Sequence, residues 1–271
     1  MLRSLYSGVS GLQGFQTKLD VIGNNIANVN TVGFKKSRVV FQDILSQNIA
    51  GATAPADDGL GGINPKQIGL GSKAASIETI FTTGSPQTTN VPTDLSIEGD
   101  GFFMVQNAAG AIYYTRAGNF TLDAAGNLVT SQGMKVLDSG GAPINLPPDE
   151  VVSYSIGQDG SINTVDDTGA VTEGYAQLGV MTFTNPAGLN KIGGSLYEYT
   201  VNAGAANDDP LTPVTPTDAN VKIISGQLEM SNVDLSEELT EMIVAQRGLQ
   251  ANSRIITTSD SVLEELVNLK R

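Results

Sequence analysis

The sequence contains no cysteine, no histidine and no tryptophan among its 271 residues. Without cysteine there is no disulfide, no thiol nucleophile and no thiolate-bound metal. Without histidine the chain lacks the usual general base near neutral pH and the commonest transition-metal ligand. These absences argue against an enzyme and against a metal or cofactor.

Basic residues and long apolar runs are also scarce. The 15 Lys and Arg are outnumbered by 28 Asp and Glu, which gives a net charge of −13. Nucleic acid is therefore not expected as a partner, because phosphate binding needs concentrated positive charge. No stretch approaches the roughly 18 apolar residues that span a bilayer, so membrane insertion is not expected. The N-terminus MLRSLYSGVS lacks the features of a cleaved signal peptide, which predicts a cytosolic protein or one exported by another route.

No stretch carries a catalytic or ligand-binding motif. The glycine-rich pieces 59–62 and 69–71 lack the lysine and the strand–loop–helix context of a phosphate-binding loop. Acidic turns at 123–127, 159–161 and 166–167 lack the spacing and terminal glutamate of an EF-hand, and turn formation explains them better. A carboxylate-pair enzyme stays open without support, and we expect no catalytic, cofactor-binding or metal-binding residues.

The first clear feature is an apolar periodicity near the N-terminus. Steps of three and four residues alternate almost throughout, as in the seam of a coiled coil. An ordinary amphipathic helix covering a domain core is the simpler alternative. The apolar positions are Leu2, Leu5, Val9, Leu12, Phe15, Leu19, Ile22, Ile26 and Val29.

A matching run closes the chain, and we expect the two helices to pack on each other or on copies of themselves. Asp234, followed three positions later by Glu237, predicts the N-cap of this helix. Gln246, Ser253 and Asp260 occupy alternate seam positions, where they either fix register and partner number or face solvent. The apolar positions are Leu235, Leu239, Met242, Leu249, Ile256, Leu263 and Val267.

The first helix is rich in glycine, with Gly8, Gly11, Gly14 and Gly23. Each glycine costs roughly 1 kcal/mol of helix stability relative to alanine. Such a helix is poorly stable alone and permits close backbone approach. We therefore expect it to be disordered in the monomer and ordered by many neighbours.

The middle of the chain changes period. The apolar pattern of residues 35–50 predicts a strand or a short helix. Residues 51–75 are rich in Gly, Ala, Asp and Pro, which predicts a long loop. From about residue 76, short period-two runs separated by turn signals indicate an antiparallel β domain. An exposed loop at 202–220 and a last strand over 221–230 precede the terminal helix.

These patterns predict an α+β fold. The N- and C-terminal helices pair as a coiled-coil-like inner domain formed by residues 1–30 and 232–271. Residues 31–75 are an irregular connecting region, and residues 76–231 are an inserted antiparallel all-β outer domain.

Both ends of the chain resemble the flagellar rod and hook proteins, the axial proteins of the bacterial flagellum. The opening 1–41, the closing block 229–270 and the middle pieces DLSIEGDGFFMV and YTRAGNFTLDAAGNLVT carry the resemblance. An asparagine-rich block after the first helix looks like the family signature. Its residues are Asn24, Asn25, Asn28, Asn30, Thr31, Gly33 and Phe34.

The resemblance implies a non-enzymatic subunit with many copies of itself as partners. The terminal helices would line the central channel of a helical tube, and the β domain would form its outer wall. Further implied partners are the neighbouring axial proteins (distal rod and hook–filament junction), the hook cap and the flagellar type III export apparatus. Phe41 and Leu45, spaced F-x-x-x-L, resemble the family's export-gate motif.

Within the family, the opening block, the segment GLGSKAASIETI and the terminal NLKR resemble most the short hook protein of Gram-positive, Bacillus-type bacteria. This implies a subunit of the bendable hook, a universal joint that transmits motor torque to the filament outside the cell after signal-less export. The alternative is the distal rod of the basal body, whose protein is similar in length and in both terminal blocks. A secreted β-rich adhesin or hydrolase with helical ends is the third interpretation.

Overall fold

The computed structural model describes residues 2–52, 54, 62–147, 151–205 and 212–269. The chain divides into two compact units. The helical unit comprises Met1–Ala27, Ser37–Thr79 and Asp234–Arg271, and the β unit comprises Asn28–Lys36 and Ile80–Val233. The fold class is α+β, with helices at both ends of the chain and antiparallel strands between them.

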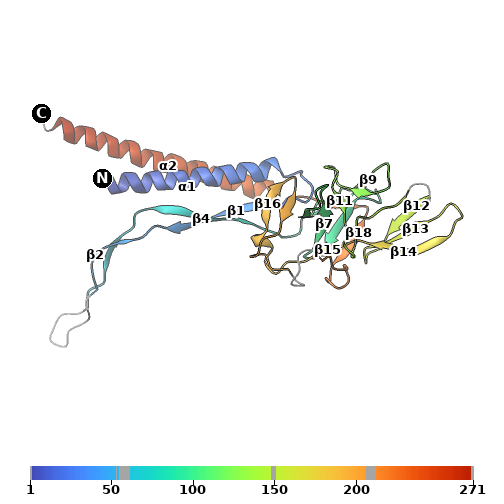
Figure 1. Ribbon diagram of the computed structural model, residues 1–271. Helices are drawn as coiled ribbons and strands as arrows, with labels where there is room; N and C mark the ends of the chain where they lie inside the picture. Colours follow the sequence, from blue (N-terminus) through green and yellow to red (C-terminus); the bar gives the residue numbers. More distant parts are fainter. Residues whose placement is uncertain (1, 53, 55–61, 148–150, 206–211, 270–271) are drawn as a thin grey trace. The chain divides into compact units, whose positions relative to one another are not determined.

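Two long helices form the core of the helical unit. Helix α1 (Leu2–Ala27) and helix α2 (Leu235–Asn268) lie antiparallel, with the N-terminus of α1 and the C-terminus of α2 at the same end (Figure 1). Asp234 is the N-cap of α2, as predicted, and its side chain accepts hydrogen bonds from the backbone N–H groups of Ser236 and Glu237. Among the described residues no helix is long and apolar enough to cross a membrane.

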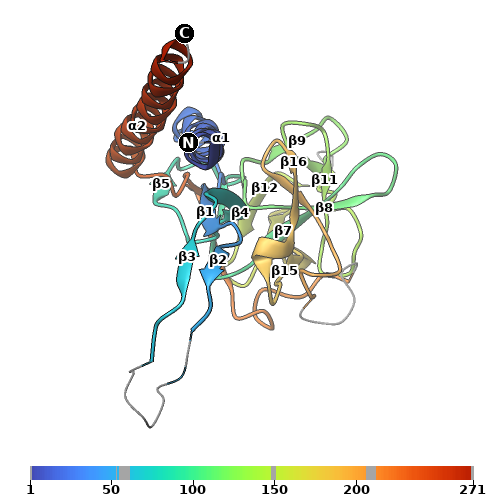
Figure 2. The same ribbon diagram turned by 90° about the vertical axis from the view of Figure 1, so that its left-hand side faces the viewer.

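A two-stranded ribbon packs along α1. Strand β1 (Ser37–Asp43) pairs antiparallel with β4 (Ser72–Thr79), and β2 (Gln47–Ala50) pairs with β3 (Lys66–Ile68). The β2–β3 pair extends away from the two helices (Figures 1 and 2).

The expectation of a loop over 51–75 is wrong at β3 and at the start of β4. The polar and small residues of SKAAS carry no apolar alternation, and so no pattern predicts a strand there. Their backbone is held instead by the ladder with β1. Residues 55–61 of the expected loop lie outside the described residues.

The β unit is built around β7 (Phe102–Gln106), which is buried on both faces. Phe103 and Val105 belong to one apolar cluster, and Phe102 and Met104 belong to the other. Successive strand residues point to opposite faces, so a continuous apolar run marks a central strand. The two clusters together are the core of this unit.

The described strands of the β unit form one large antiparallel sheet and three smaller ones. The large sheet has the order β16-β17-β8-β7-β11-β10-β9, with β15 also paired to β7. The others are β12-β13-β14, β18-β6 and β19-β5. The bounds are β5 Pro86–Thr88, β6 Leu95–Glu98, β8 Ile112–Thr115, β9 Thr121–Leu122, β10 Leu128–Val129, β11 Lys135–Val136, β12 Ser153–Ile156, β13 Ser161–Val165, β14 Val171–Gln177, β15 Val180–Met181, the 3-10 turn η1 Pro186–Gly188, β16 Asn190–Gly193, β17 Leu196–Glu198, β18 Lys222–Ser225 and β19 Gln227–Glu229.

The last predicted strand, 221–230, is two strands. Gly226 separates β18 from β19 and has a φ of +77°. Glycine adopts this left-handed conformation at no steric cost. The two strands consequently pair with different partners, β6 and β5.

Candidate assembly surface

The face of α2 that packs on α1 is rotated from the predicted seam. Contacts between α1 and α2 are made at Gly248 and Ile256, which meet Phe15 and Gly8. The buried and half-buried positions of α2 at alternating steps of four and three define this face, here called the seam. They are Glu238, Met242, Ala245, Leu249, Asn252, Ile256, Ser259 and Leu263.

Four of the predicted α2 positions, Met242, Leu249, Ile256 and Leu263, lie in the seam. Leu235 and Leu239 do not, because 43% and 49% of their surfaces are exposed. Their packing on copies of the chain, the other arrangement expected from the sequence, stays a prediction. Within the chain, Glu238, Ala245, Asn252 and Ser259 take the alternate seam positions. Gln246, Ser253 and Asp260 are exposed, in line with the solvent-facing alternative.

On α1 most of the predicted packing positions are buried or half-buried. Ile22 is buried and Val9 is exposed. The side chains of the remaining predicted packing positions are half-buried: Leu5, Leu12, Phe15, Leu19 and Ile26.

Glycine allows the helices to interlock. A Cβ atom on Gly248 would lie 2.5 Å from Cζ of Phe15, so the ring of Phe15 rests on the backbone of α2. On the other side of α1, a Cβ on Gly14 would lie 2.9 Å from Cε1 of Phe41. Three of the glycines predicted to matter, Gly8, Gly11 and Gly14, are therefore approached closely, whereas Gly23 has nothing within 4 Å.

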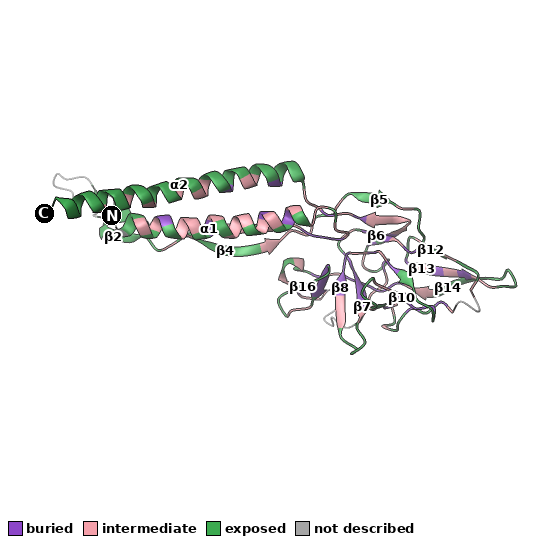
Figure 3. Cartoon of the chain, turned by 90° about the horizontal axis from the view of Figure 1, so that it is seen from above, coloured by how far each residue is buried: buried purple, intermediate pink, exposed green. Residues whose placement is uncertain are grey.

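Much of α2 is left exposed despite its apolar residues (Figure 3). Among its described residues only Glu238 and Ala245 are buried. With 3.6 residues per turn, the exposed large apolar residues of α2 other than Val267 fall on two stripes, one on each side of the seam. The first flanking stripe is Leu235, Leu239 and Ile243; the second is Val244, Ile255, Val262 and Leu266.

A helix that is apolar on several sides is normally buried on several sides. Exposed apolar surface of this extent marks an interaction site. The flanking stripes are therefore the candidate assembly surface.

The signature block joins the end of α1 to the β unit. Asn25 is buried in the helical unit, where its amide pairs with the backbone of Ser37. Thr31 donates from its backbone N–H to the carbonyl of Asn28 at 3.1 Å and closes a turn. Asn24 and Asn30 lie at exposed positions.

Gly33 and Phe34 belong to the β unit. Gly33 has a φ of +66°, and a Cβ there would lie 2.5 Å from the backbone nitrogen of Ala117. The position requires glycine for both reasons. The buried ring of Phe34 faces Nζ of Lys191, which lies 3.9 Å from the ring centroid. The signature block is thus built to bring the backbone close to the β unit.

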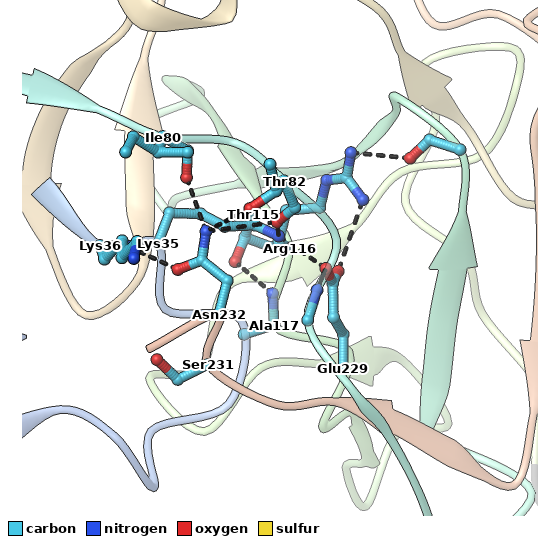
Figure 4. A network of polar contacts seen from close by, with 12 residues as sticks. Lys35, Lys36, Ile80, Thr82, Thr115, Arg116, Ala117, Glu229, Ser231 and Asn232 are labelled. Carbon is cyan, nitrogen blue, oxygen red and sulfur yellow. Dashed lines mark hydrogen bonds and ion pairs between the residues drawn. The ribbon is translucent and has the colours of Figure 1, made fainter. Parts of the chain in front are cut away.

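Sequence reasoning missed a buried charge network next to the signature (Figure 4). Nζ of Lys35 lies 2.6 Å from Oε1 of Glu229, and NH1 of Arg116 lies 3.4 Å from Oε2 of the same carboxylate. Burial lowers the pKa of Lys35 and of Arg116, and the charge of Glu229 opposes that shift. The available signal was that all three residues fall within stretches that carry the family resemblance.

The two residues of the export-gate motif lie in different surroundings. The ring of Phe41 packs on that of Phe15, with centroids 6.2 Å apart, while Leu45 is 85% exposed. Within the described part of the chain, no group of three or more His, Cys, Asp and Glu is placed to hold a metal ion.

The fold and the flanking stripes define a class of protein, one whose paired terminal helices carry exposed apolar surface. Three family profiles match the sequence. They are the flagella basal body rod protein over residues 5–35, the flagellar hook protein FlgE/F/G D1 domain over 96–164, and the flagellar basal body rod FlgEFG protein C-terminal region over 219–269.

Full-length relatives agree. The chain is 56% identical to the flagellar basal-body rod protein FlgG of Bacillus subtilis over 272 residues, covering all of both chains. It is 39% identical to the protein of that name from Borreliella burgdorferi over 273 residues, again with full coverage of both chains. The flagellar hook protein FlgE of the same spirochaete is 30% identical in an alignment that extends over 447 residues and includes the whole of both chains.

The chain belongs to the flagellar rod and hook protein family. The resemblance found in its terminal blocks is confirmed, including its similarity to the Bacillus type. It is a structural component of the flagellar axis and not an enzyme.

Proposed function

We propose that this chain is a subunit of the distal rod of the flagellar basal body. Many copies polymerise through the helical unit into a tube around the export channel. The match over its whole length to rod proteins carries this proposal, since those alignments span 272 and 273 residues for a chain of 271.

The hook interpretation has less support. The hook relative aligns over 447 residues, so it contains long segments that have no counterpart in the 271 residues of this chain. Identity to it is also lower, 30% against 56% for the Bacillus rod protein. The distal rod is the alternative that the sequence analysis gives to the hook, and it is therefore the better proposal.

The flanking stripes support a tube wall built from helices. One neighbour would cover Leu239 and its stripe, and a second would cover Ile255 and its stripe. Burying a leucine or isoleucine stabilises by about 1.5–3 kcal/mol, so several such residues on each side can drive assembly. The β unit would then form the outer wall, and residues 37–79 would lie between wall and channel.

The remaining partners follow from the same proposal. Neighbouring axial proteins would contact the two ends of the tube, and the cap and the type III export apparatus would act during growth. Phe41 and Leu45 are proposed as the export-gate residues in the unfolded chain only, because Phe41 packs on Phe15 after folding.

Immunogold electron microscopy with antibodies against the β unit tests the location. A distal rod subunit is labelled in isolated hook–basal bodies, below the hook, and is not reached in intact cells. Label on the hook of intact flagella would contradict the rod and favour the hook. Purified protein that forms no tubes at any concentration would contradict both.

A further inference from the structure

The chain passes between the helical unit and the β unit four times. The passages are at 27–28, 36–37, 79–80 and 233–234. The residues on both sides of each passage lie within the part of the chain that the structure describes. Two asparagines, one inside each unit, hold these segments together.

In the helical unit the asparagine is Asn25. Its Nδ2 donates to the carbonyl of Ser37 at 2.9 Å, and its Oδ1 accepts from the N–H of Ser37 at 3.0 Å. Nδ2 also donates to Oε2 of Glu238 at 3.2 Å. Ser37 is in turn the ladder partner of Thr79. One buried amide thus connects the end of α1, the start of β1 and the first turn of α2, and β4 joins through its pairing.

In the β unit the asparagine is Asn232 (Figure 4). Its Oδ1 accepts from the N–H of Lys36 at 2.7 Å, and its Nδ2 donates to the carbonyl of Ile80 at 2.8 Å. Nδ2 lies 3.0 Å from Oγ1 of Thr82. The N–H of Ile80 also donates to the carbonyl of Lys36 at 2.9 Å. Three of the four passages therefore meet at this side chain.

The chemistry explains why both residues are asparagine. A side-chain amide has the donor and the acceptor of a peptide group, so it can pair with a backbone edge in both directions. Aspartate would lose the donor, and alanine would leave backbone groups without their partners. A polar group left unpaired by such a loss carries its full desolvation penalty.

We propose that Asn25 and Asn232 are positioning residues: Asn25 holds the four passages together within the helical unit and Asn232 holds three of them together within the β unit, so that these covalent connections carry load jointly. This deepens the proposed rod function, on which the mechanical role rests, since a rod transmits torque. Three connections held together at both ends resist twisting better than connections that are not linked to one another.

Amide hydrogen exchange on tubes of the full-length chain directly tests the hydrogen bonds made by Asn25 and Asn232. Asn232→Ala is expected to speed exchange at Lys36, and Asn25→Ala at Ser37, by about tenfold or more, because each amide loses its acceptor. The matched control is Asn163→Ala, since Oδ1 of Asn163 accepts from Gly174 within the β unit at 2.9 Å, away from the passages. That variant should speed exchange at Gly174 alone.

Spin labels test the mechanical consequence. The chain has no native cysteine, so Gln246→Cys and Ala108→Cys at exposed positions place one label in each unit. The distance distribution should broaden in Asn25→Ala and Asn232→Ala and stay unchanged in Asn163→Ala. Unchanged exchange or unchanged width in both variants overturns the proposal.

The two proposals fail separately. If Asn232→Ala does not fold, Asn232→Asp keeps the size and the acceptor, and should still broaden the distribution through loss of the bond to Ile80. If the variants form tubes that localise normally and the width of the spin-label distance distribution is unchanged, only the proposed role of Asn25 and Asn232 is refuted. Label on the hook in microscopy would refute only the rod.

Discussion

Nζ of Lys35 lies 2.6 Å from Oε1 of Glu229, with 0% and 4% of the two side chains exposed. The residues are 194 positions apart in the sequence. Lys35 also donates to the carbonyl of Thr82 at 2.7 Å, and the N–H of Gly84 donates to the same Oε1 at 2.9 Å. The segment that follows α1 is therefore fixed in the β unit by a satisfied buried ion pair.

Replacing Glu229 should be the more damaging change at this network. Glu229→Gln removes the counter-charge that is hydrogen-bonded to the buried Lys35 and Arg116, and removing one partner of a buried pair costs about 3–5 kcal/mol. Lys35→Met should cost less, because Glu229 keeps Arg116. Urea unfolding of the full chain, followed by the far-UV signal of the β unit, measures both.

The matched control is Arg38→Met. Arg38 and Glu78 form an ion pair whose side chains are 63% and 45% exposed, and such pairs contribute about 0–1 kcal/mol. If Glu229→Gln and Arg38→Met lower the free energy of unfolding equally, the larger contribution expected of the buried ion pair is contradicted.

Two glycine-to-alanine changes should have opposite signs. Gly23→Ala adds a methyl group in open space and should stabilise α1 by about 1 kcal/mol through helix propensity. Gly248→Ala gains the same propensity but displaces the ring of Phe15, and overpacking costs about 1–3 kcal/mol. Thermal melting of assembled tubes distinguishes them, and a gain from Gly248→Ala would refute the interlocked seam.

The sequence predicted the elements better than the surfaces. Periodicity identified both helices, and the capping pattern identified the N-cap at Asp234, because these depend on local sequence. It did not identify the seam within the chain, because that seam includes Glu238 and Ala245, which no apolar count would select. The pairing of Lys35 with Glu229 depends on tertiary contact, and spacing alone carries no information about it.

Polar substitutions in the flanking stripes should impair assembly without affecting the fold. Leu239→Gln and Ile255→Gln each remove about 1.5–3 kcal/mol of burial in the tube, and so should raise the critical concentration for polymerisation about tenfold or more. Sedimentation of tubes measures the change. Thr240→Gln, at an exposed polar position, is the control, and an equal effect there would argue against the stripes.

Acid should destabilise the β unit partly through Asp123. Hydrogen bonds from the side chain and backbone of Asn127, with a further one from the N–H of Ala125, lower the pKa of Asp123 below its ordinary 3.8. Since the folded pKa lies below the unfolded one, the stabilisation is complete above about pH 4 and is lost as the pH falls through the folded pKa.

Asp123→Asn should therefore lower stability at pH 7 and flatten its dependence on pH below about pH 4. Urea unfolding at pH 7, 5 and 3 measures this. Asp167→Asn removes the same charge from another exposed turn and serves as the control. A slope that is unchanged in Asp123→Asn would remove the turn from the acid response.

The helices should be ordered only in the tube. Helix stability in proteins comes chiefly from tertiary packing, and among the described residues of α2 only Glu238 and Ala245 are buried. In a dilute monomer, amides of 2–27 and 235–268 should exchange rapidly while those of β7 and β13 stay protected. In tubes all four segments should be protected. A monomer whose helices are as protected as β7 would show that the chain completes its own fold, and the flanking stripes would then need another explanation.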